Sequence, residues 1–118
     1  MHSEAITLFQ LLEQKNSYLL EFHEINMDEL SRLAEGSVNN LENFYYSREI
    51  LLNAINKLDH EISKNKIEAL KVNKQEKKKL IDILNLKRKM VLSILDQDLA
   101  IISLVGQLKK SNTKDIAV

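Results

Sequence analysis

The sequence predicts an all-α protein, an elongated antiparallel helical hairpin or bundle of three long helices that span about residues 3–34, 38–63 and 73–110. Two observations lead to this prediction. The 118 residues include no proline and only two glycines, so the chain encodes few turns. Apolar residues also recur at helical spacing over long runs. The chain has the length of a single domain, and an elongated bundle of this size has a thin core.

The first predicted helix begins near Ser3, a residue suited to the N-cap, with Glu4 in the first turn, where a carboxylate suits the helix dipole. Its apolar stripe runs unbroken to Ala34, with the polar residues Asn16 and His23 inside it. We expect His23 to be a core or interface histidine with a hydrogen-bond partner. The apolar members of the stripe are Phe9, Leu12, Leu19, Leu20, Met27 and Leu30.

A turn is predicted at Glu35-Gly36-Ser37. Glycine tolerates the left-handed conformation of the position that follows a helix, and Ser37 is suited to cap the next helix. The alternative is one helix from Ser3 to Ser63, about 90 Å long at 1.5 Å per residue. We favour the hairpin because a glycine and a capping residue are adjacent where a turn is needed.

The second predicted helix, residues 38–63, carries its apolar residues on one face that Arg48 interrupts. In the third predicted helix, Asp98 lies near the apolar stripe in a similar way. A carboxylate near an apolar stripe needs a partner, for which Arg48 and Lys87 are the candidates. The apolar face of the second helix consists of Leu41, Phe44, Tyr45, Leu51, Leu52, Ile55, Leu58 and Ile62.

Residues 64–79 are strongly basic. Seven lysines against two glutamates give this stretch a net charge of +5, while residues 1–36 carry −5 from two basic and seven acidic residues. We predict a basic loop over about 64–73, either solvated or facing the acidic first helix. Asn73 followed by Glu76 resembles a capping box, which would start the third helix. The whole chain has zero formal net charge and no aromatic residue interleaves the lysines, which argues against nucleic acid as a partner.

The third predicted helix, about residues 73–110, has an apolar arc roughly twice as wide as one packing face requires. For Val91 to Ile94 two interpretations stay open: contact with a partner, or a central position between the other two helices. For the near-continuous run from Leu99 to Val105 we favour a partner or a homodimer, because so small a bundle can hardly cover it. Leu104 and Leu108 lie on the flank and are expected to matter least for stability. The candidate partner-binding residues are Leu95, Leu99, Ile101, Ile102, Leu104, Val105 and Leu108.

No pattern predicts an active site, a metal site or a cofactor site. The three histidines do not pair at a spacing that would hold a metal, and no glycine-rich phosphate loop or nucleophile arrangement is present. The chain has no cysteine, which excludes disulfides and thiolate chemistry. We therefore expect a binding module that is not an enzyme.

No targeting or membrane segment is predicted either. The start MHSEAITL lacks a basic region followed by a long apolar run, so we expect no secretory signal. The run from Leu99 to Val105 is too short to span a bilayer. We expect one soluble, cytoplasmic helical domain over residues 1–118, with a loose tail at 111–118.

The second helix also carries motifs of a known family. Gly36-Ser37-Val38, Leu41 and Arg48-Glu49-Ile50-Leu51-Leu52 resemble the FlgN/FliT group of flagellar type III export chaperones, whose second helix often reads G-[DE]-x-x-x-L followed by RE-x-LL. Ser37 stands where that pattern has an acid. The segments Leu95-Asp96-Gln97-Asp98-Leu99 and Ser103-Leu104-Val105-Gly106-Gln107 look like the FliT side of the group. The resemblance covers about residues 8–110.

The resemblance implies a small, all-helical cytoplasmic chaperone without ATPase activity. Such a protein would hold the C-terminal helical segment of a late flagellar subunit, a filament cap or hook–filament junction protein, in a hydrophobic groove. It would keep the subunit soluble and deliver it to the export gate and ATPase components. FliT-like members carry a C-terminal helical segment that can occlude the binding face.

Independently of the resemblance, the wide apolar arc favours a partner helix laid into an apolar groove. Two alternatives stay open. One is a structural coiled-coil adaptor or self-associating bundle without a client. The other is a small regulator that binds a transcription factor or nucleic acid.

Overall fold

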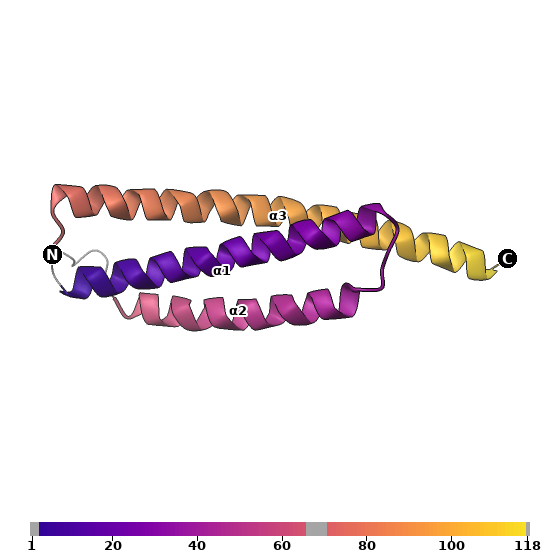
Figure 1. The fold of residues 1–118 in the computed structure, drawn as a ribbon, viewed down its shortest axis with the longest axis horizontal. Helices are drawn as coiled ribbons and strands as arrows, with labels where there is room; N and C mark the ends of the chain where they lie inside the picture. The colour runs from indigo at the N-terminus through magenta and orange to yellow at the C-terminus, as the bar shows by residue number, and fades with distance from the viewer. Residues whose placement is uncertain (1–2, 66–70, 118) are drawn as a thin grey trace.

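The described part of the chain forms three long helices, as predicted. The computed structural model describes residues 3–65 and 71–117, with side chains placed over 7–65 and 71–110. The helices are α1 (Ser3–Ala34), α2 (Leu41–Ser63) and α3 (Lys74–Ala117), and the molecule measures 67 × 21 × 18 Å (Figure 1). α2 runs antiparallel to both of the others, so α1 and α3 are parallel.

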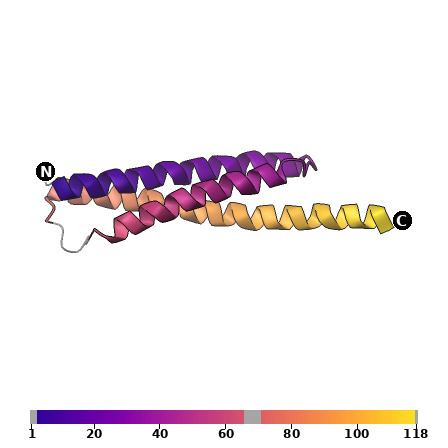
Figure 2. The same ribbon diagram turned by 90° about the horizontal axis from the view of Figure 1, so that it is seen from below.

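α1 is the helix that holds the bundle together. It packs along both α2 and α3, whereas no described Cα atom of α2 lies within 8 Å of one of α3. In Figure 1, α1 accordingly lies between the two. The C-terminal end of α3 continues past the turn that joins α1 to α2, as Figures 1 and 2 both show.

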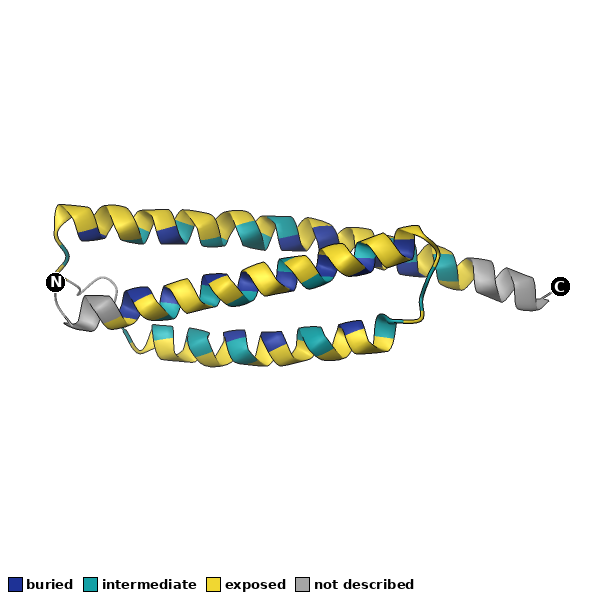
Figure 3. Cartoon of the chain, in the orientation of Figure 1, coloured by how far each residue is buried: buried dark blue, intermediate teal, exposed yellow. Residues whose placement is uncertain are grey.

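The inward-facing residues follow the heptad spacing of coiled coils. In α1 and α3 they alternate at intervals of four and three, which keeps one seam of each helix on its neighbour (Figure 3). Several of these positions are polar, and Asn16, Asn26 and Gln97 are buried there. On α1 the seam is Leu12, Asn16, Leu19, His23, Asn26, Leu30 and Leu33; on α3 it is Leu80, Ile83, Lys87, Met90, Ile94, Gln97, Ile101, Leu104 and Leu108.

The apolar core is divided into three clusters along the length of the bundle, each with only four or five buried residues. A fully buried aliphatic or aromatic side chain stabilises by about 1.5–3 kcal/mol, so each cluster depends on a few residues. The clusters are Leu8, Phe9, Leu12 and Ile83; Leu19, Phe22, Leu51, Ile55 and Ile94; and Leu33, Phe44, Ile101 and Val105.

The predicted turn at Gly36 is confirmed. Gly36 has a φ of 85° and its N–H donates to the carbonyl of Leu33 at 2.9 Å, while the N–H of Ser37 donates to the carbonyl of Arg32 at 2.9 Å. These two bonds form a Schellman motif, which satisfies the last carbonyls of α1. The predicted start of the second helix is wrong, because α2 begins at Leu41 and Ser37 is used in the turn. Asn40 precedes α2, and its side chain does not cap the helix.

The capping box that starts α3 is confirmed. The Glu76 N–H donates to Asn73 Oδ1 at 2.8 Å, and the Asn73 N–H donates to Glu76 Oε1 at 3.2 Å. The loose tail is wrong over 111–117, which continue α3 to Ala117, since no glycine or proline in that stretch ends the helix. Of the predicted basic loop, 66–70 lie outside the described residues.

Candidate partner-binding surface

The structure divides the seven predicted binding residues into two groups. Ile101 and Val105 are buried in the cluster with Leu33 and Phe44, so they belong to the core of this chain and are unavailable to a partner. Leu104 and Leu108 are half-buried and pack against that same cluster. The prediction that these two matter least for stability therefore does not fit their position.

The other three candidates are exposed. Leu95, Leu99 and Ile102 are 53%, 69% and 67% exposed to solvent. They are therefore not core residues, and their apolar surface is available to a partner. Leu99 follows Leu95 by four residues and precedes Ile102 by three, so the three side chains are neighbours on one face of α3.

Gln97 explains why part of the apolar arc predicted for the third helix lies outside the bundle. The Asn26 Nδ2 donates to Gln97 Oε1 at 3.0 Å, and Gln97 Nε2 donates to the His23 carbonyl at 3.2 Å. These bonds hold a polar residue in the interface with α1 and draw Ile94 and Ile101 inward with it. Hydrophobicity alone centres the buried face nearer to Leu95 and Ile102, which the structure leaves outside.

An ion pair joins α2 to α3 where their backbones are apart. Arg48 Nη2 lies 3.0 Å from Asp98 Oδ1, with both side chains largely covered, which confirms one of the two partners predicted for Asp98. The guanidinium also lies over the rings of Phe22 at 4.7 Å and Phe44 at 5.0 Å. Cation–π contacts of this kind hold the planar group in place.

Exposed apolar side chains surround this ion pair. Tyr45 precedes Arg48 by three residues and Leu52 follows it by four, which places both beside Arg48 on the surface of α2. Leu95 and Ile102 have the same spacing from Asp98 on α3. We call the set the Arg48–Asp98 face; its apolar members are Tyr45, Leu52, Leu95, Leu99 and Ile102, all at least 44% exposed.

Sequence reasoning missed the α2 side of this face. Tyr45 and Leu52 belong to the predicted apolar face of the second helix, and they were expected to pack within the bundle with the rest of it. Their spacing from Arg48 could have identified them. If Arg48 pairs with Asp98, the helix neighbours of both residues lie on one surface.

The remaining polar candidates have structural positions. His23 Nε2 is 2.9 Å from Ser93 Oγ in the α1–α3 interface, which confirms the predicted hydrogen-bonded histidine. Lys79, in the lysine-rich start of α3, pairs with Glu13 of α1 at 3.3 Å and lies 5.5 Å from the centre of the Phe9 ring. Among the residues that the structure describes, no group of three His, Cys, Asp or Glu could hold a metal ion.

By length and composition alone, one helix of the described chain, in Lys74–Lys110, contains an 18-residue stretch apolar enough to cross a membrane. The stretch includes Asp96 and Asp98. A charged residue at the centre of a bilayer costs about 2.5–3.5 kcal/mol on insertion scales, whereas in this bundle Asp98 is paired.

Comparison of the chain with protein-family models, with curated proteins and with solved structures found no match.

Proposed function

We propose that this chain is a cytoplasmic export chaperone of the FlgN/FliT type, which binds the C-terminal helical segment of a late flagellar subunit on the Arg48–Asp98 face. The observation that carries the proposal is the exposed apolar surface shared by α2 and α3, two helices whose backbones do not meet. A partner helix laid between them would turn three helices into a four-helix arrangement.

The chemistry of the face is suited to an amphipathic helix. Leu99 and Ile102 offer two large aliphatic groups and Tyr45 an aromatic group with a hydroxyl, a composition typical of residues that dominate binding energy. The Arg48–Asp98 pair is held by Phe22 and Phe44, so a partner would meet a polar group that is already ordered. Delivery of the client to the export gate or ATPase components is the further step that the family resemblance implies.

The test is calorimetry of the full chain with C-terminal peptides from a filament cap protein and from a hook–filament junction protein. Leu99→Gln combined with Ile102→Gln should abolish binding of the matching peptide while the helical circular dichroism spectrum is unchanged. The control is Leu86→Gln, because Leu86 is also half-exposed on α3 but does not belong to the face. Equal affinity of the double variant and the wild type would remove the client from this face.

A second candidate function is favoured by the spacing of exposed residues along α3. Arg88, Leu92, Leu95, Leu99 and Ile102 recur at intervals of four and three on the outside of the bundle, a seam on which a second copy could form a coiled coil. A self-associating adaptor would be dimeric at micromolar concentration in analytical ultracentrifugation, and Leu92→Glu would make it monomeric. A chaperone that binds clients would be monomeric or would exchange its second copy for the client.

A further inference from the structure

A concave surface separate from the Arg48–Asp98 face follows the seam between α1 and α2, and no described residue of α3 lines it. It consists of three adjoining hollows. Ile50 lines the first and the second, and Ile25, Asp28 and Ser47 line the second and the third. The hollows are therefore continuous, from Glu61 near the end of α2 to Asn40 at its start. We call this surface the α1–α2 groove.

The wall that α2 contributes has an exposed apolar centre. Ile50, which lines two of the three hollows, is 53% exposed. The half-buried side chains of Tyr18 and Ile25 approach from α1. Side chains of this kind anchor an apolar residue of a partner.

The wall that α1 contributes is acidic. Glu21, Glu24 and Asp28 line the middle of the groove and are exposed, at the spacing of three and four that puts them in one row. None of the three takes part in an ion pair within the described part of the chain. A row of uncompensated carboxylates beside an apolar strip repels phosphates and attracts cations.

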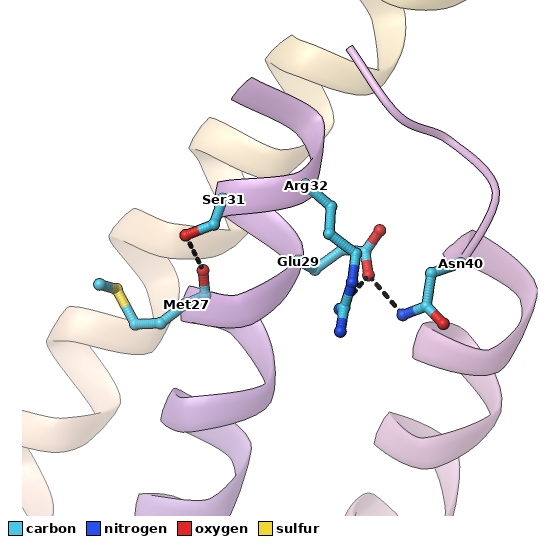
Figure 4. Close-up of polar contacts among 5 residues, drawn as sticks. All are labelled: Met27, Glu29, Ser31, Arg32 and Asn40. Atoms are coloured by element: carbon cyan, nitrogen blue, oxygen red, sulfur yellow. Dashed lines mark hydrogen bonds and ion pairs between the residues drawn. The ribbon is translucent and has the colours of Figure 1, made fainter. Parts of the chain in front are cut away.

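The end of the groove near the turn holds a buried carboxylate with an unused acceptor. Glu29 is fully buried; its Oε2 accepts from Asn40 Nδ2 at 2.9 Å and pairs with Arg32 Nη1 at 3.4 Å (Figure 4). Its Oε1 has no hydrogen-bond partner. Buried carboxylate oxygens are normally satisfied, so among the described residues that line the groove Glu29 carries a buried acceptor without a donor.

We propose that the α1–α2 groove docks a basic amphipathic helix of a partner protein. Apolar side chains of that helix would cover Ile50 and Ile25, and its lysines or arginines would lie along the row of Glu21, Glu24 and Asp28. Since the groove shares no lining residue with the apolar members of the Arg48–Asp98 face, both surfaces can be occupied at once.

The first test uses two synthetic helical peptides with the same leucine pattern, one with lysines on its polar face and one with glutamines in their place. Calorimetry with the full chain should detect the lysine peptide only, with affinity that falls as salt is raised from about 50 mM to about 300 mM. Equal binding of the glutamine peptide, or affinity indifferent to salt, would overturn the proposal without the use of any variant.

The second test locates the peptide. Glu24→Gln combined with Asp28→Asn should weaken the lysine peptide about fivefold or more at low salt, since each exposed charged contact contributes modestly. Asp82→Asn combined with Asp96→Asn is the matched control: it removes the same charge at exposed positions of α3, outside the groove, and it should bind as the wild type does. An equal loss in this control would assign the effect to overall charge and refute the groove.

The third test separates this surface from the proposed client face. Leu99→Gln combined with Ile102→Gln should leave binding of the lysine peptide unchanged. If that variant loses the lysine peptide, the peptide sits on the Arg48–Asp98 face and the groove proposal is wrong, whatever the outcome for the flagellar peptides.

Discussion

The side chain of Asn26 donates a hydrogen bond of 3.0 Å to Oε1 of Gln97, which joins two fully or nearly buried amides 71 positions apart in the chain. It is one of several such contacts between α1 and α3. Asn16 Nδ2 donates to the Ile83 carbonyl at 3.1 Å, and His23 meets Ser93. Polar groups at core positions of a coiled coil fix its register, because any shift leaves them without partners.

Asn26→Ala should therefore destabilise the chain more than its size suggests. It leaves Oε1 of Gln97 without its donor in a buried interface, at a cost of about 1–3 kcal/mol. Urea denaturation followed by circular dichroism measures the difference. Asn26→Leu combined with Gln97→Leu should recover much of that loss, because both polar groups are then gone. A double variant less stable than Asn26→Ala would contradict this account.

The two glycines should respond in opposite directions to alanine. Gly36 has a φ of 85°, so Gly36→Ala should cost about 1 kcal/mol or more. Gly106 lies within α3 with nothing within 4 Å of an added Cβ, so Gly106→Ala should stabilise by about 0.5–1 kcal/mol. Thermal melts of the two variants and the wild type measure both changes. A shift of the melting temperature in the same direction for both variants would contradict this prediction.

Two pairs of apolar residues on α3 should separate folding from binding. Leu99→Gln with Ile102→Gln removes exposed surface, so the melting temperature should stay the same or rise. Leu104→Ser with Leu108→Ser removes side chains packed on the cluster of Leu33 and Phe44, and should cost about 2 kcal/mol or more. Thermal melts measure both. A large loss of stability in the first pair would mean that the Arg48–Asp98 face is covered in solution.

Arg48 should be sensitive even to a change that keeps its charge. Arg48→Lys retains a cation near Asp98 but loses the planar group held by Phe22 and Phe44, so we expect a cost of about 1 kcal/mol in urea denaturation. Arg48→Met should cost more, since Asp98 would then lack its cation in a half-buried position. A lysine variant as unstable as the methionine variant would show that geometry matters and charge does not.

The fold was predictable because its signals are local. The glycine at position 36 and the reciprocal pair Asn73 and Glu76 act within a few residues, and the structure uses each as expected. The lack of a side-chain cap on α2 has a tertiary reason. Asn40 gives its side chain to Glu29 of α1, a contact that the sequence around Asn40 does not contain.

The candidate site was predictable only in part. The exposure of Leu99 and Ile102 follows from an apolar arc too wide for the bundle to cover. The burial of Ile101 and Val105 depends on where the arc is centred. That centre is set by Gln97. Its polarity predicts a surface position, but its hydrogen bonds to α1 keep it in the interface.

The short turn at Gly36 has a consequence for the order of assembly. Only residues 35–40 separate α1 from α2, whereas the partners of α1 on α3 lie about 70 positions away, as Asn26 and Gln97 do. Short loops close at lower entropic cost and local contacts form faster, so the hairpin of α1 and α2 should form first. At about 5–20 residues per second, synthesis of α3 then takes several more seconds. During that interval the side of α1 that receives α3 is open on the nascent chain.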